Sequence, residues 1–188
     1  MTLRTALVLT GTLAAVLAAS VFFVARSPER DDPMMLHTDG IGPLRLGRDY
    51  QESAAAAARI APDTAFAGRG CGGLDEIRYS GHLADLPVTV MAMAADGLLV
   101  EIESSVDAPL QTADEAACLA LRDQFATVFV ARFGTPAATW TVAKPVSREH
   151  MLRSGPVVIV ARWFRTGGSC YVSAHYGVNE TEPPVRQP

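Results

Sequence analysis

The chain has 188 residues, of which 49% are hydrophobic and 19% are charged, and its formal net charge at pH 7 is −4. This length and composition suit one folded domain with a sizeable core. The acidic balance excludes the basic surface on which nucleic-acid-binding proteins depend. Lys144 is the only lysine among 16 basic residues, a bias typical of GC-rich bacterial genomes.

The amino-terminal segment carries the strongest signal for cellular location. Residues 6–25 contain no charge and lie between Arg4 and Arg26. As a helix this run would be about 30 Å long, the thickness of a bilayer core. We therefore expect residues 1–25 to anchor the protein in the inner membrane by a single pass. The alternative is a cleaved signal peptide, which the bulky residue Phe23 disfavours at a cut after Ala25.

The rest of the chain divides into three parts. Residues 26–38 contain Pro28 and Pro33 and predict a polar linker. Residues 39–178 predict one α+β domain, and residues 179–188 predict a disordered tail. A short tail before a first apolar segment usually stays in the cytoplasm, so we expect the domain to face the periplasm.

The first half of the domain combines one helix with several strands. The alternation over 39–47 predicts a short strand. Asp49 and Glu52 have the spacing of a capping box, and Pro62 ends the helix that they begin. Strands are expected at 76–80, 87–94 and 98–103. The Asp96-Gly97 pair between the last two strands is a strong hairpin signal.

The second half repeats this order. Thr112 and Glu115 form a capping box, and Gly134 and Pro136 end the helix predicted over 112–133. One apolar stripe along that helix consists of Cys118, Leu121, Phe125, Val128 and Phe129. Strands are expected at 139–142, 157–164 and 170–176.

The order of elements predicts an α+β fold, in which an antiparallel sheet carries two helices packed on one face. A helix followed by three strands occurs twice. This repetition indicates either two copies of a helix-plus-three-strand module or one continuous sheet that carries both helices.

The opening of the domain has a recognisable pattern. Ile41-Gly-Pro-Leu-Arg-Leu-Gly47 followed by a capped helix resembles the start of many uncharacterised bacterial envelope proteins. The layout is similar to the small α+β modules of outer-membrane assembly lipoproteins and of β-lactamase inhibitor proteins. A methionine usually follows the last glycine of that pattern, whereas Arg48 stands here. The resemblance implies no activity.

The three cysteines cannot all pair within one chain. Cys71 lies in a glycine loop before a strand, and Cys170 opens another strand. Cys118 falls on the apolar helix stripe and is expected to be a buried free thiol. We therefore predict a Cys71–Cys170 disulfide, although sequence alone does not determine connectivity.

The sequence shows no recognisable catalytic or metal-binding pattern. The cysteines and His175 lack the closely spaced ligand pair of structural zinc sites, so no metal or cofactor is expected. Ser169 has no nucleophile elbow around it. His82 is expected in a turn and His150 in a loop. No spacing brings these three residues together, and we expect a protein that is not an enzyme.

The faces of the strands carry the remaining signal. The following residues alternate toward the predicted core: Ile77, Tyr79, Leu98, Val100, Ile102, Trp140, Val142, Val157, Ile159, Ala161, Trp163, Val172, Ala174 and Tyr176. The opposite face collects Glu76, Arg78, Glu101, Glu103, Thr141, Arg162, Phe164, Tyr171, Ser173 and His175. A solvated face is the simple interpretation. Because arginine and tyrosine are enriched at binding hot spots, we also consider a protein-binding face there, with Arg78, Arg162, Phe164, Tyr171 and His175 as candidates.

These patterns lead to one preferred function and one alternative. We expect a membrane-anchored periplasmic protein without catalytic activity. It would bind another envelope protein, or a larger membrane complex, as an accessory or assembly factor. The alternative is a secreted inhibitor or small-ligand-binding protein released by signal cleavage.

Overall fold

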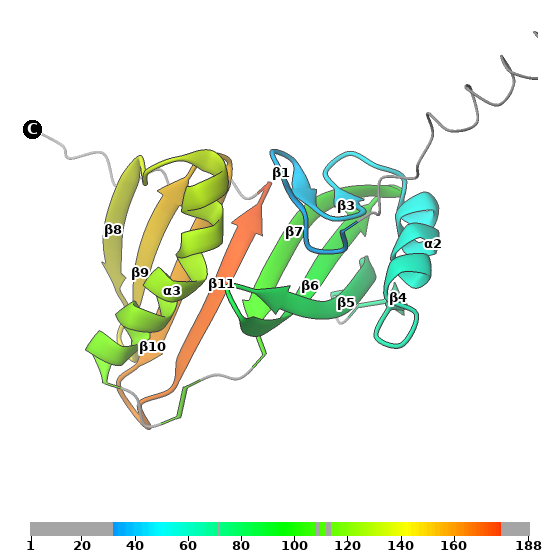
Figure 1. The fold of residues 1–188 in the computed structure, drawn as a ribbon. Helices are drawn as coiled ribbons and strands as arrows, with labels where there is room; N and C mark the ends of the chain where they lie inside the picture. The colour runs from blue at the N-terminus through cyan, green and yellow to red at the C-terminus, as the bar shows by residue number, and fades with distance from the viewer. Residues whose placement is uncertain (1–31, 71, 108–109, 112–113, 178–188) are drawn as a thin grey trace, which may run out of the picture. The chain divides into compact units, whose positions relative to one another are not determined.

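The computed structural model describes residues 32–70, 72–107, 110–111 and 114–177 (Figure 1). The predicted anchor over 1–25 and the predicted tail over 179–188 lie outside the described residues. Neither helix in the described ranges is long and apolar enough to cross a membrane.

Over the described residues the fold is α+β, as expected, and consists of two helices, a large antiparallel sheet and a small one. The large sheet has eight strands in the order β4-β5-β6-β7-β11-β10-β9-β8. The bounds of its strands are β4 Phe66–Arg69, β5 Asp75–Leu83, β6 Leu86–Ala95, β7 Leu98–Val106, β8 Ala138–Ala143, β9 Ser147–Ser154, β10 Val157–Phe164 and β11 Cys170–Tyr176.

Each half of the domain contains one helix followed by four strands, and the two halves join where β7 pairs with β11. The sequence predicted only three strands in each half, because β4 and β9 were missed. The expectation that His150 lies in a loop is wrong, because it belongs to β9, whose sequence SREHMLRS is mostly polar. In the structure Glu149 of β9 accepts a hydrogen bond from Arg162 on β10, and Arg148 of β9 donates one to Glu115 on α3 (Glu115–Phe133). These partners compensate the polar side chains of the strand.

The first helix follows its sequence signals. Helix α2 spans Tyr50–Ile60, and the side chain of Asp49 accepts a hydrogen bond from the backbone N–H of Glu52 at 3.0 Å. This cap satisfies one of the N–H groups that a helix start leaves unpaired.

The second helix begins later than predicted. Its cap is Asp114, whose carboxylate accepts from the N–H of Ala117 at 2.7 Å, and not Thr112, which lies outside the described residues. The end of the helix is confirmed, since Gly134 has φ of 92°, a conformation that glycine adopts without strain.

A small three-stranded sheet covers part of the large one. It consists of β1 (Leu36–His37), β2 (Gly40–Ile41) and β3 (Leu44–Arg45), where the sequence predicted a linker and one short strand. Ile41 and Leu44 are fully buried. The hydroxyl of Tyr79 lies 2.7 Å from the carbonyl oxygen of Pro33, which ties this segment to β5.

Both helices and β1–β3 pack on one face of the large sheet, as Figure 1 shows. Fully buried side chains from both halves, including Tyr79, Ile102 and Ile159, form a single core there. We call the other face of the sheet the open face. It carries Arg78, Glu103, Arg162, Tyr171, His175 and the residues paired with them in register.

In two strands, the residues that face the core differ from those that the sequence predicted. In β7 a register shift beside Met93 turns Leu99 into the core, while Leu98 and Val100 are 48% and 45% exposed. A bulge of this kind reverses the alternation of a strand. In β8, Trp140 and Val142 pair with the open-face residues of β9, so the expectation that they face the core is wrong.

The predicted disulfide is also wrong. Cys118 on α3 is bonded to Cys170 at the start of β11, with their Cα atoms 5.5 Å apart. Cys118 is fully buried as expected, but it is not a free thiol. Helix packing over the sheet brings it to Cys170, and sequence spacing cannot reveal that contact. Cys71 lies outside the described residues.

Candidate functional site

The open face of the large sheet is the candidate functional site. Antiparallel pairing aligns one residue from each of seven neighbouring strands in a row: Phe66, Arg78, Met91, Glu103, His175, Val158 and Arg153. Two of the predicted binding residues, Arg78 and His175, therefore share a row but are separated by β6 and β7. At about 4.8 Å per strand they lie roughly 14 Å apart.

The other three predicted binding residues line one hollow. Arg162, Phe164 and Tyr171, together with Thr166 and Ser169, line an open hollow of about 370 Å³ at the β10–β11 hairpin. Arg162 lies directly opposite Tyr171 in register. The rings of Phe164 and Tyr171 meet edge to face with centroids 5.8 Å apart. The structure thus assembles a cationic and aromatic cluster from residues that sequence reasoning had only assigned to a common face.

A buried carboxylate holds Arg162 in place. Glu149 on β9 is 4% exposed, and its Oε1 accepts hydrogen bonds from Arg162 Nε and from Lys144 Nζ, both at 2.7 Å. Burial raises the pKa of Glu149, but the two cationic donors outweigh that effect and keep the pKa below its usual value. Among the described residues, the two Nη groups of Arg162 have no hydrogen-bond partner. They are therefore available to a ligand in the hollow.

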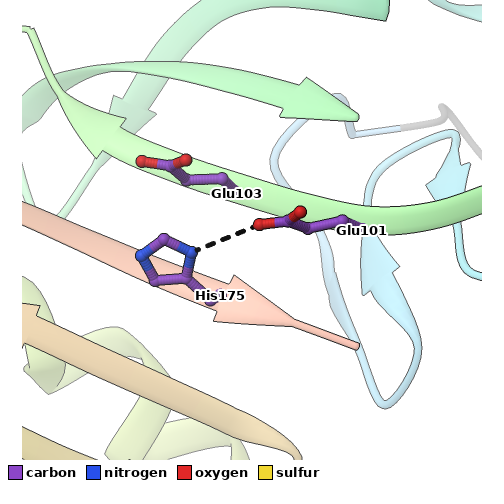
Figure 2. Close-up of side chains that lie close together, drawn as sticks. All are labelled: Glu101, Glu103 and His175. Carbon is purple, nitrogen blue, oxygen red and sulfur yellow. Dashed lines mark ion pairs between the residues drawn. The ribbon is translucent and has the colours of Figure 1, made fainter. Parts of the chain in front are cut away.

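A second cluster lies near the middle of the open face, where β7 meets β11 (Figure 2). Glu101 and Glu103 project from β7, and His175 faces them from β11. Their potential ligand atoms all lie within 4.8 Å of one another, and Nδ1 of His175 is 3.9 Å from Oε1 of Glu101. The other ring nitrogen, Nε2, is 2.7 Å from the hydroxyl oxygen of Ser173.

Sequence reasoning placed these residues on one face but did not bring them together. The two glutamates lie two positions apart on one strand and therefore on the same face. This spacing was the sequence signal that could have indicated a cluster of carboxylates. Their contact with His175 depends on the pairing of β7 with β11, which are far apart in the chain.

Ser173, His175 and Glu101 are arranged in series like the three residues of an acyl-transfer triad, but the described residues around them do not complete its geometry. The 3.9 Å separation between His175 and Glu101 exceeds a hydrogen bond. Residues 173–175 pair with β7 on one side and with β10 on the other, so their backbone N–H groups are used in the sheet. They cannot serve as the oxyanion-stabilising donors that this chemistry requires.

The polar residues His82, His150 and Ser169 lie apart from one another. His82 is on the open face of β5, and Ser169 lines the hollow. His150 lies on the helix-covered face of β9, not in a loop, with Nε2 2.9 Å from Oε1 of Glu115. A hydrogen bond from Arg148 holds the pKa of Glu115 below its usual value. This cluster attaches the start of α3 to β9.

Comparisons of the chain with protein-family models, with curated proteins and with solved structures gave no match. The resemblance to envelope-protein modules thus stays a prediction from the sequence.

Proposed function

We propose that the protein is a non-catalytic accessory or assembly factor of the bacterial envelope and binds a partner protein through the hollow of the open face. The observation that carries this proposal is the gathering of Arg162, Phe164 and Tyr171 around one hollow. Arginine and tyrosine are enriched among the residues that dominate binding energy at protein interfaces.

The hollow is preorganised for a partner. Arg162 donates through Nε to a buried carboxylate, so less side-chain entropy is lost when its Nη groups engage a ligand. Tyr171 is 50% exposed and packs against Phe164, which supplies apolar area beside the charge. A partner side chain with a carboxylate suits this arrangement, because a guanidinium presents two parallel donors.

The expected location rests on two features. The uncharged run over 6–25 supports an inner-membrane anchor with the domain in the periplasm. The Cys118–Cys170 disulfide is consistent with an oxidising compartment.

The test is affinity purification of the tagged full-length protein from native membranes in mild detergent, with mass spectrometry of the intact chain and its companions. We expect an uncleaved chain with one stoichiometric envelope protein. A chain that is trimmed near residue 20, soluble and alone would overturn the proposal in favour of a secreted inhibitor or ligand-binding protein.

Two variants locate the contact. Phe164→Ala with Tyr171→Ala keeps the Lys144–Glu149–Arg162 cluster intact, and adding Arg162→Ala removes the charge as well. We expect the double variant to reduce partner recovery and the triple variant to abolish it, with unchanged circular dichroism.

The matched control is Arg59→Ala with Leu74→Ala, which changes exposed basic and apolar side chains outside the hollow. Equal partner recovery from the triple variant and from this control would show that the hollow is not the contact.

A further inference from the structure

We propose that Glu101, Glu103 and His175 form a binding site for a divalent transition-metal ion, with Zn²⁺ the favoured ion. The site lies at the junction of β7 and β11, on the same face as the hollow but built from other residues. It does not depend on the proposed partner binding.

The geometry of the strands presents three donors to one point. Glu101 and Glu103 are two positions apart on β7 and so project to the same face. His175 stands directly opposite Glu103 in register, and Figure 2 shows its ring beside both carboxylates. Ligands of a tetrahedral zinc ion with bonds of about 2.1 Å lie roughly 3.4 Å apart. The donor atoms, all within 4.8 Å of one another, reach that spacing by small rotations of the long glutamate side chains.

The imidazole is already oriented for coordination. Ser173 lies two residues before His175 on the same face, and its hydroxyl oxygen is 2.7 Å from Nε2. When this hydroxyl accepts from Nε2–H, the neutral ring carries its lone pair on Nδ1. Nδ1 is the nitrogen that faces Glu101 (Figure 2). Metal-binding histidines are usually fixed in this way, by a hydrogen bond from the ring nitrogen that does not bind the metal.

The two carboxylates lack a permanent cationic partner. Within the described part of the chain, Glu103 makes no hydrogen bond or ion pair, and Glu101 meets only His175, at 3.9 Å. The nearest arginine along the row on the β6 side is Arg78, which lies beyond Met91. It is directed to Glu76, at 3.7 Å, and to the ring of Phe66, at 4.6 Å.

This arrangement favours a bound cation. Glu101 is only 31% exposed in its side chain, and Met91, Met93 and Val158 are the neighbours of the cluster in register. Two carboxylates held close together repel one another, and apolar neighbours reduce the screening that water provides. A divalent ion between the carboxylates removes that repulsion.

The donor set selects the type of ion. An imidazole nitrogen suits zinc and similar transition metals, whereas Ca²⁺ and Mg²⁺ prefer oxygen ligands alone. Three protein ligands leave at least one coordination position open, as in zinc sites that bind water or an external ligand. The open position would point away from the sheet, where a water molecule or a partner side chain can occupy it.

The site is tested by calorimetric titration of ZnCl₂ into the full-length protein in detergent, prepared without a histidine tag and freed of metal with EDTA. We expect one Zn²⁺ per chain with micromolar or tighter affinity. Glu103→Gln combined with His175→Ala should abolish this binding, and Ser173→Ala should weaken it by about tenfold.

The matched control is His82→Ala, which removes another open-face histidine outside the cluster and should leave the affinity unchanged. Circular dichroism checks the fold of every variant, and the visible spectrum of bound Co²⁺ reports on the ligands in the wild-type protein without mutation. The proposal is overturned if wild-type protein shows no saturable binding. It is equally overturned if the double variant binds Zn²⁺ like wild type, or if Co²⁺ gives no protein-dependent spectrum. These outcomes leave partner capture through the hollow unaffected, so failures of the two proposals are distinguishable.

Discussion

The two halves of the domain share one order of elements but differ in what holds them together. In the first half α2 packs on β5, and the β1–β3 segment is joined to the sheet by burial of Ile41 and by the Tyr79 hydroxyl. In the second half, α3 is connected to the sheet by a disulfide and by the Glu115–Arg148–His150 cluster.

The second half also carries charge beneath its open face. Glu149 lies buried under Arg162 and Lys144, and this network supports the hollow. Both halves pack their helix on the sheet through apolar side chains, and the second half adds a disulfide and ionic links between its helix and its strands. The half with these added links is the one that contains Arg162, which lines the hollow proposed to bind a partner.

The largest expected effect comes from the disulfide. Cys118→Ala should lower the free energy of unfolding by about 4 kcal/mol, because the bond closes a loop across 52 positions of the chain. Urea unfolding of the full-length protein under oxidising conditions measures this loss, and a reductant should produce a similar one in wild type. Cys71→Ala is the control. An equally large loss in that variant would contradict the Cys118–Cys170 pairing.

The next effect is a pH dependence located in the second half. Glu149 has a folded-state pKa below the ordinary 4.5, so the stability it contributes is present above pH 4.5 and is lost as the pH falls through the folded pKa. Glu149→Gln should therefore cost about 2 kcal/mol at pH 7, the scale of hydrogen bonds to a charged group, and much less in acid.

Denaturant midpoints measured from neutral to acidic pH test this expectation. Asp63→Asn, at an exposed position after α2, should reproduce the wild-type curve. Parallel curves for wild type and Glu149→Gln at all pH values would show that the charge network does not stabilise the fold.

The smallest expected losses of stability come from removing the two helix caps, and these losses should be equal in the two halves. Asp49→Ala and Asp114→Ala each remove one helix cap of the same geometry, and each should cost about 1 kcal/mol. Thermal melts of the two variants and of Asp49→Asn, which retains a capping oxygen, make the comparison. A much larger loss for Asp114→Ala would mean that the cap of α3 also supports the adjoining Glu115–Arg148 contact.

Local signals in the sequence predicted the class of the fold, two helix ends and one hairpin. The order of helix and strand signals predicted the α+β class, and capping chemistry predicted the start of α2 at Asp49 and the end of α3 at Gly134. The hairpin at Asp96-Gly97 was predicted as well, and both residues have positive φ, 51° and 79°. Each of these features depends on residues within a few positions of one another, so a single sequence contains the whole cause.

The other features of the fold and of the candidate sites depend on tertiary contacts. β9 is a strand because its charged side chains find partners on β10 and α3, and the bulge in β7 reverses which residues face the core. Cys118 meets Cys170 because α3 packs over β11. His175 meets the two glutamates because β7 and β11 join the halves of the sheet. These contacts connect residues far apart in the chain, and their energy comes from packing and charge pairing that no local pattern records.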